Sequence, residues 1–431
     1  MNLIKTPIGG MRDFSPADVK KRDYILSVIE QVAYSYGYQK IETPAMEHLE
    51  NLTSKEGGEN EELIFKILKR GQSLEDAEKS GDNLSDSALR YDLTVPLARY
   101  FSNNKGYLPL PFKVLQIGPV WRADRPQKGR FRQFIQCDVD IIGDNSILAE
   151  IDVISTIVEM INKLFSKIST PSITVHINDR RILTSTALFA GFDEKDVSTV
   201  LIELDKTEKI GLSKVKDNLI NLGFDSEKVG AFINLFENVK EGIKIKDFCS
   251  QLDKNIPEEN VVQDLENIIE IISETSKEKC QIMFDPTLVR GMGYYTGPIF
   301  ECKLSNYSSS IAGGGRYDKM IGKFDGSGDV SACGFSIGFE RISEILDDAG
   351  FAPKSTQRMT AILVDKDVPQ EQLIEITTRA KELRHDGSIV SILPMNKNLG
   401  YQIKMLEESG YSSIEKIYRD KWYLDFDNNS N

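Results

Sequence analysis

Residues 121–143, WRADRPQKGRFRQFIQCDVDIIG, hold a dense group of cations. Five fall within 11 residues and only Asp124 opposes them: Arg122, Arg125, Lys128, Arg130 and Arg132. The whole chain has a net charge of −13, so this local reversal of sign favours a bound polyphosphate or nucleic-acid backbone. The alternative is a solvated hairpin tip between two strands.

The residues after these cations have the alternation of a β-strand. One face would carry Phe134, Gln136, Asp138 and Asp140, and the other would be apolar (Ile135, Cys137, Val139 and Ile141). If the polar face lines a pocket, its carboxylates suit an amine or a protonatable ring, Phe134 can stack on a base, and Arg122 can hold a phosphate. If it faces water, the segment is an ordinary amphipathic strand.

Two glycine-rich segments permit close approach of the backbone to a ligand. LVRGMGYYTG at residues 288–297 surrounds Arg290 with glycines and two tyrosines, and AGGGRYD at residues 312–318 predicts a tight turn with Arg316. Neither has the spacing of a dinucleotide-binding loop or a P-loop.

A third segment, GFSIGFER at residues 334–341, places Arg341 at the start of a predicted helix. The helix dipole disfavours a cation there. The position therefore indicates either a nearby anionic ligand or a surface salt bridge to an acid.

The elements that position these residues follow from apolar periodicity. Residues 16–36 and 147–165 predict helices, and residues 183–279 predict a helical segment rich in Lys, Asp, Glu and Asn. Residues 71–87 are polar and predict a loop or hairpin tip. The last part alternates strand and helix from residue 360, which predicts a small α/β domain. Other predicted strands lie at residues 40–43, 112–117, 134–142, 281–284, 299–304 and 334–338.

Composition excludes several classes of protein. No run of about 18 apolar residues predicts a transmembrane helix, and residues 1–16 lack the apolar run of a signal peptide. Five cysteines without a close pair disfavour disulfides and a cysteine-based zinc site, and predict a reducing cytoplasm. Three histidines far apart exclude a two-histidine metal motif on one helix, so no protein-bound metal is expected.

Together these segments resemble the class II aminoacyl-tRNA synthetases, and within them the histidine–tRNA ligase family. YQKIETPAME at residues 38–47 resembles motif 1, while residues 121–143 and 334–341 resemble motifs 2 and 3. The histidine-specific motifs are tighter, and they occur in order: LRYDLTVPLARY at residues 89–100, LVRGMGYYTGPIFE at 288–301 and AGGGRYD at 312–318.

The resemblance implies an α+β fold in which a six-stranded antiparallel sheet flanked by helices carries the active site. It implies a catalytic core at residues 1–182 and 280–348, interrupted by a helical insertion at residues 183–279. A linker at residues 349–358 would lead to an α/β anticodon-binding domain at residues 359–431, which looks short at its C-terminus.

The resemblance also implies roles around ATP. Arg122 would bind the α-phosphate, and Arg290 would be a second catalytic cation near that phosphate and the substrate carboxylate. Phe134 and Arg341 would lie on opposite faces of the adenine, with Arg341 reaching the γ-phosphate.

For histidine, the family pattern implies a site for each part of the amino acid. Asp92, Thr94 and Gln136 would hold the α-amino group. Asp140 and Tyr295 would read the imidazole ring, and Tyr294 belongs to the same motif.

The implied activity joins histidine to ATP, with Mg²⁺ accompanying ATP, and transfers histidine to the 3′ end of its tRNA. Gln127 would lie close to the extra 5′ guanosine of that tRNA, while Arg125, Lys128 and Arg130 would contact the acceptor stem. Motif 1 implies a homodimer, and the implied location is the cytoplasm.

Two departures from the family pattern stand out. Met292-Gly293 replace the usual Leu-Asp, so one pocket carboxylate is missing or its work passes to Asp138 or Asp140. Asp140 itself replaces a glutamate. Two alternatives remain open: a non-catalytic regulatory paralogue like the subunit that accompanies ATP phosphoribosyltransferase, and an activating enzyme that does not charge tRNA.

Overall fold

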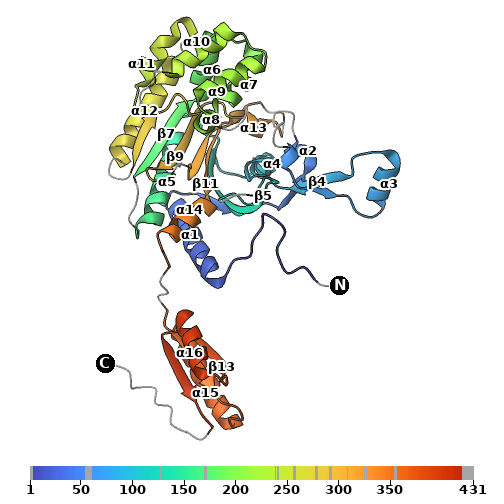
Figure 1. Cartoon of the computed structure of the whole chain (residues 1–431), viewed down its shortest axis with the longest axis vertical. Helices are drawn as coiled ribbons and strands as arrows, with labels where there is room; N and C mark the ends of the chain where they lie inside the picture. Colours follow the sequence, from blue (N-terminus) through green and yellow to red (C-terminus); the bar gives the residue numbers. More distant parts are fainter. Residues whose placement is uncertain are drawn as a thin grey trace. The chain divides into compact units, whose positions relative to one another are not determined.

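The protein is described here as a computed structural model covering residues 3–53, 61–126, 129–168, 172–237, 239, 242–255, 259–276, 280–290, 294–307, 309–324, 326, 328–353 and 357–419. The chain divides into two compact units, Met1–Ala352 and Pro353–Asn431 (Figure 1). Within these described ranges, no helix has the length and apolar character needed to cross a membrane.

A mixed sheet forms the centre of the first unit. Among the described residues it has eight strands, in the order β1 (Gln39–Ile41), β5 (Phe112–Trp121), β6 (Gln133–Ile142), β11 (Ala332–Gly338), β10 (Ala312–Arg316), β9 (Pro298–Leu304), β7 (Ile173–Asp179) and β8 (Gln281–Phe284). All neighbours from β5 to β7 are antiparallel, which confirms the predicted six-stranded antiparallel sheet. The prediction omitted the edges, where β1 and β8 add in parallel.

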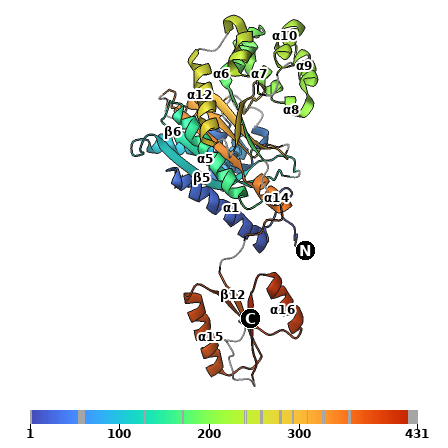
Figure 2. The same ribbon diagram turned by 90° about the vertical axis from the view of Figure 1, so that its left-hand side faces the viewer.

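Long helices pack along this sheet. α1 (Pro16–Ser35) starts with a capping box, in which Ser15 Oγ accepts from the Asp18 amide and the Asp18 carboxylate accepts from the Ser15 amide. α5 (Leu148–Phe165) buries most of its apolar side chains and packs on the sheet against β6 and β11 (Figure 2). α14 (Phe339–Asp348) follows β11 directly, so that the third residue of the helix is Arg341.

Helices gather in the chain between β7 and β8 (Figure 1). They are α6 (Arg180–Phe189), α7 (Glu194–Leu204), α8 (Thr207–Ile210), α9 (Leu212–Asn221), α10 (Ser226–Glu237), α11 (Ile245–Cys249), the 3₁₀ turn η2 (Ser250–Asn255) and α12 (Glu259–Ser276). Aromatic contacts join this helical segment to the sheet, since Phe236 packs on Phe248 and Phe248 lies 5.8 Å from Phe284 of β8 between ring centroids.

A small antiparallel sheet extends from the first unit, in the order β2 (Met46–His48), β4 (Ser85–Leu89) and β3 (Lys66–Leu68). Residues 71–87 were predicted to form a loop or hairpin tip, and the segment does connect the antiparallel strands β3 and β4. The prediction missed a helix within this connection, because α3 (Gln72–Ser80) forms there and ends at Gly81 with a φ of 76°. Ala77 is the buried residue of α3, so too little apolar surface is present to reveal a helix in the sequence. α2 (Leu49–Leu52) packs on this sheet, and the 3₁₀ turn η1 (Glu61–Leu63) precedes β3. α4 (Thr94–Asn104) follows β4 and packs on α13 (Asp318–Gly322), which follows β10.

The predicted tight turn at residues 312–318 is also wrong. Ala312–Arg316 is β10, a fully buried strand in the middle of the sheet. A Cβ added to Gly314 would lie 1.9 Å from the carbonyl oxygen of Gly334, so glycine serves here to bring two strands together. Arg316 is a structural residue, since its Nε lies 2.6 Å from the buried carboxylate of Glu150.

The second unit contains a parallel sheet, in the order β13 (Ile389–Pro394), β12 (Met359–Val364) and β14 (Ser413–Ile417). α15 (Gln370–His385) and α16 (Leu399–Glu408) connect these strands. The order of elements agrees with the predicted α/β alternation.

Candidate active site

A cavity of about 690 Å³ opens over β6, β10 and β11 of the main sheet. It brings together most of the residues singled out from the sequence: Asp92, Thr94, Arg122, Arg130, Phe134, Gln136, Asp140, Arg290, Tyr294, Tyr295 and Arg341. Arg125 is exposed and does not line it. Gln127, Lys128, Met292 and Gly293 lie outside the described residues. A second hollow of about 440 Å³, between α5 and α12, contains none of the residues that line the first.

Glycines make the floor of this cavity. Gly334 of β11 stands opposite Asp140 in the strand register, and a Cβ there would lie 1.8 Å from Asp140 Oδ1. A Cβ on Gly313 would lie 2.2 Å from an Arg290 guanidinium nitrogen. The glycine-rich motifs therefore create space for charged side chains rather than for a phosphate loop.

Three carboxylates of the cavity, which we call the acidic cluster, are Asp92, Asp138 and Asp140. Burial raises the pKa of all three, to about 7 for Asp138, and the Asp138 charge raises the pKa of Asp140 further. Asp140 Oδ1 accepts a 2.6 Å hydrogen bond from the Tyr317 hydroxyl. The described part of the chain holds no group of three or more His, Cys, Asp or Glu residues arranged to bind a metal ion.

The predicted alternation of residues 134–141 is confirmed. Phe134, Gln136, Asp138 and Asp140 all line the cavity, whereas Cys137, Val139 and Ile141 are in the hydrophobic core. The polar face of β6 therefore faces a cavity, and the alternative of an ordinary solvated strand is wrong.

Three arginines of the cavity, which we call the arginine group, are Arg122, Arg290 and Arg341. Arg122 donates from Nε to the carbonyl oxygen of Tyr91 at 3.1 Å and from a terminal nitrogen to Gln136 Oε1 at 3.4 Å. Its guanidinium also lies 4.2 Å from the centroid of the Tyr91 ring and 5.2 Å from that of Phe134. These contacts orient Arg122 and leave its charge available to an anion.

Arg341 donates to the carbonyl oxygen and, at 3.3 Å, to the hydroxyl of Ser310. Burial lowers its pKa, and the nearby charges of Arg130 and Arg290 lower it further. The described residues offer Arg341 no carboxylate within ion-pair distance, which favours an anionic ligand over the surface salt bridge considered above.

Arg290 differs from the other two because it has an internal partner. It donates to Glu301 Oε1 at 2.7 Å, and its pKa is lowered by burial but raised more by Glu301 and the neighbouring tyrosines. The rings of Tyr294 and Tyr295 lie beside it, 4.3 Å apart between centroids. Glu301 thus fixes the position of Arg290 before any substrate is bound.

The sequence analysis missed two further groups. Arg12 and Arg22 form ion pairs with the buried carboxylate of Glu340, at 3.0 and 2.8 Å, and hold the N-terminal segment against α14. No spacing in the sequence indicates this contact, because more than 300 positions separate the partners.

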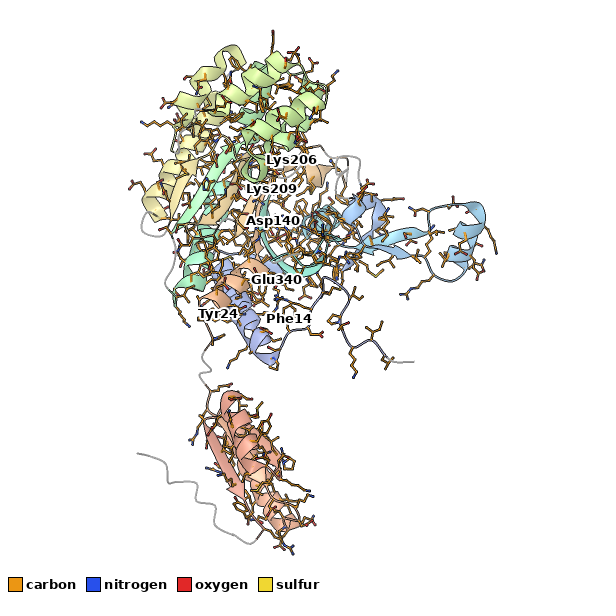
Figure 3. All side chains as sticks on the ribbon, in the orientation of Figure 1. Phe14, Tyr24, Asp140, Lys206, Lys209 and Glu340 are labelled. Atoms are coloured by element: carbon orange, nitrogen blue, oxygen red, sulfur yellow. The ribbon has the colours of Figure 1, made fainter. Side chains whose placement is uncertain are left out.

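The second missed group comes from the helical segment, which contributes Arg180, Lys206 and Lys209 to the cavity. In Figure 3, Lys209 lies on one side of Asp140 and Glu340 on the other. The spacing of Lys206 and Lys209 would place them on one helical face, but nothing in the sequence directs that face to the cavity.

Comparison with known proteins decides the family. A family model described as histidyl-tRNA synthetase matches residues 10–342. The chain belongs to the histidyl-tRNA synthetase family. Over 425 residues it is 39% identical to the histidine–tRNA ligase of Leifsonia xyli subsp. xyli (strain CTCB07), which covers 96% of this chain and 96% of that protein.

Solved structures agree with this membership of the histidyl-tRNA synthetase family. The crystal structure of histidyl-tRNA synthetase from Nostoc sp. PCC 7120 matches with a TM-score of 0.75 and 27% identity, covering 95% of this chain and 90% of that one. An ATP phosphoribosyltransferase regulatory subunit/histidyl-tRNA synthetase from Bacillus halodurans C matches with a TM-score of 0.74 over 97% of this chain and 99% of that one. At 20% identity, this second likeness shows the fold alone.

Proposed function

We propose that this protein is a histidine–tRNA ligase. It joins the carboxylate of histidine to the α-phosphate of ATP with release of pyrophosphate, and then transfers histidine to the 3′ end of its tRNA with release of AMP. The observation that carries the proposal is the single cavity in which the acidic cluster and the arginine group meet, in a member of the histidyl-tRNA synthetase family. Buried carboxylates beside the aromatic rings of Tyr294 and Tyr295 suit histidine, and arginines suit a triphosphate.

The proposed amino-acid site uses the polar face of β6 and the start of α4. Asp92, Thr94 and Gln136 hold the α-amino group, and Asp140 and Tyr295 read the imidazole ring. The support is that all five line one cavity. Tyr294 packs beside Tyr295 and closes the site with a second aromatic ring.

ATP binding is proposed for the arginine group and Phe134. Arg122 stabilises the charge that develops at the α-phosphate during attack by the histidine carboxylate, and Arg290 acts near that phosphate and carboxylate. Adenine stacks on Phe134 and lies under Arg341, which reaches the γ-phosphate. Catalysis on this proposal is positioning and electrostatic stabilisation without a covalent enzyme intermediate, and Mg²⁺ arrives with the phosphates of ATP.

The proposed tRNA contacts lie in the loop between β5 and β6. Arg125 and Arg130 are exposed cations there, as a contact to an acceptor stem requires. Gln127 recognises the extra 5′ guanosine of the tRNA, and Lys128 contacts the phosphate backbone of the acceptor stem. For residues 359–431, which lie in the second unit, we propose anticodon binding.

The proposal also covers the assembly and the cellular location. A homodimer through the motif 1 region is supported by the position of β1 as an edge strand of the main sheet. A cytoplasmic location is supported by the five cysteines, which are all buried free thiols, as a reducing compartment keeps them.

Pyrophosphate exchange and tRNA charging test the function. Exchange between pyrophosphate and ATP should depend on histidine, and charging should be greater for tRNA with its extra 5′ guanosine than without it. Gln127→Ala should narrow that difference, while Lys128→Ala should reduce charging of both tRNAs alike. Absence of histidine-dependent exchange would contradict the proposal, and exchange without charging would identify an activating enzyme instead.

A further inference from the structure

Asp138 is a buried carboxylate of the cavity to which the proposed function gives no role. Its side chain is 3% exposed and shares the cavity-facing side of β6 with Gln136 and Asp140. In the strand register it stands opposite Gln116 of β5 and Ser336 of β11. Asp138 therefore lies at the floor of the proposed amino-acid site, flanked on every side by polar groups.

The two oxygens of Asp138 have different surroundings. Oδ2 accepts a 2.7 Å hydrogen bond from Gln136 Nε2. Oδ1 is buried and has no hydrogen-bond partner among the residues that the structure describes. The side chain of Ser336 interacts with this carboxylate and lowers the pKa of Asp138, although it does not reach hydrogen-bond geometry at Oδ1. A buried acceptor without a donor is unfavourable in the free protein, so a ligand donor is expected there.

The hydrogen bonds of Gln136 indicate which ligand group that is. Its amide nitrogen donates to Asp138, and its oxygen already accepts from Arg122. An amide nitrogen cannot bind an ammonium group, because both are donors. The Gln136 oxygen has a second lone pair and can still accept from the α-amino group, but a neutral amide cannot balance the positive charge. Gln136 therefore also serves to orient the Asp138 carboxylate.

The charges around Asp138 favour a cation. Asp92 lies close enough for its charge to raise the pKa of Asp138, and Asp138 in turn raises the pKa of Asp140. Among the described residues, two cations lie near Asp138. The guanidinium of Arg122 is held by Tyr91 and Gln136, and that of the buried Arg90 donates to the carbonyl oxygens of Thr43 and Pro119. A ligand ammonium would relieve the repulsion among three carboxylates, and the imidazole ring already has a place at Asp140.

We propose that Asp138 binds the α-ammonium group of the substrate through Oδ1, and that Gln136 is a positioning residue for it. This assignment rests on the proposed function, because it takes histidine as the ligand of the cavity. It adds a carboxylate to the amino-acid site in a chain that has Gly293 where its family commonly has aspartate.

Three ligands distinguish the contribution of the α-ammonium group to binding from that of the imidazole ring. Histidine has both groups and a carboxylate, histidinol has both without the carboxylate, and imidazolepropionate lacks the ammonium. Isothermal titration of the full chain with each ligand gives three dissociation constants for the wild type, Asp138→Asn and Asp140→Asn. Asp140→Asn is the matched control, since it changes the neighbouring carboxylate on the same face in the same way.

Asp138→Asn should raise the dissociation constants of histidine and histidinol by ~10- to 100-fold, the scale of one charged hydrogen bond. It should change the dissociation constant of imidazolepropionate by no more than about twofold, because that ligand has no ammonium group to donate a hydrogen bond to Oδ1. Asp140→Asn should weaken all three ligands. Where Asp138→Asn does not fold, Asp138→Ser is titrated instead, with the same pattern expected.

Equal loss for all three ligands in the Asp138 variant would overturn the assignment, as would unchanged affinity for histidine. A wild-type protein that binds neither histidine nor histidinol would overturn the proposed function itself, and the Asp138 assignment with it. The two failures are distinguishable because only the second appears in the wild type.

Discussion

Within one cavity, the acidic cluster and the arginine group are held in place by different means. Asp138 and Asp140 are short side chains in the middle of β6, and the alternation of the strand alone directs them into the cavity. Arg122, Arg290 and Arg341 are long side chains, and each is oriented by an acceptor from another part of the chain, namely Tyr91, Glu301 and Ser310.

This difference matters for what each set can do. Buried carboxylates resist ionisation, so they favour a ligand that brings donors or positive charge. A guanidinium has five donors, and acceptors that use one or two of them fix its position while leaving the rest for phosphate oxygens. The acidic cluster is thus suited to recognition of an amino acid, and the arginine group to charge stabilisation.

The largest effect is expected for Arg122. Arg122→Ala should reduce the rate constant of histidine-dependent exchange by ~1,000-fold, because one preorganised donor to developing charge is worth about this much. Arg70→Ala changes an exposed arginine outside the cavity and should exchange pyrophosphate like the wild type. A loss of less than about tenfold in Arg122→Ala would contradict the proposed role of Arg122 in stabilising charge at the α-phosphate.

Arg290 and Glu301 should behave as a unit. Arg290→Ala is expected to slow exchange by ~100-fold, and Glu301→Gln by ~10-fold, because Glu301 orients Arg290 at 2.7 Å. The double variant should be about as slow as Arg290→Ala alone, since the role of Glu301 acts through Arg290. Additive losses in this cycle would mean that Glu301 has its own contact with substrate.

Gly334 tests how tightly the acidic cluster is packed. Gly334→Ala places a Cβ 1.8 Å from Asp140 Oδ1, so the carboxylate must move. The KM for histidine should rise by at least ~10-fold while that for ATP changes little. Gly230→Ala, in α10 with no atom within 4 Å of the added carbon, is the matched control and should stabilise the fold slightly.

The smallest effect concerns pH and stability. Burial raises the pKa of Asp138 to about 7, compared with about 4 in an unfolded chain. Between these values the folded state holds a proton that the unfolded state has lost, so the free energy of unfolding should fall as pH rises from about 4 to about 7.

Asp138→Asn removes this contribution. The decrease in the free energy of unfolding between pH 5 and pH 7, measured by urea titrations at pH 5, 6 and 7, should therefore be smaller than in the wild type by about 1 kcal/mol or more. Asp86→Asn, which changes an exposed acid, should keep the wild-type slope. Identical slopes in the wild type and Asp138→Asn would show that Asp138 is ionised throughout this range.

The contrast between side chains placed by local strand alternation and side chains placed by distant partners also explains which features the sequence could predict. The polar face of β6 was predictable because strand alternation is local, and the cap of α1 at Ser15 was predictable for the same reason. Motif resemblance extended this to the antiparallel sheet and to most of the cavity. The alternation and the cap depend on residues close together in the chain, whereas the sheet and the cavity were predictable only through the resemblance.

Contacts between distant residues could not be predicted. Glu301 as the partner of Arg290, and Glu340 as the partner of Arg12 and Arg22, depend on how the sheet brings strands and termini together. The glycine run at residues 313–315 was assigned to a turn because glycine favours turns. Its actual cause is the close approach of β11, a tertiary constraint that the local pattern does not contain.

The central claim is that the acidic cluster recognises histidine and the aromatic and arginine side recognises ATP. The most direct test is to measure both KM values by pyrophosphate exchange in Asp140→Ala and Phe134→Ala. The account predicts a crossed pattern, in which Asp140→Ala raises the KM for histidine strongly with that for ATP near normal, and Phe134→Ala does the reverse. Equal rises of both constants in both variants would contradict it.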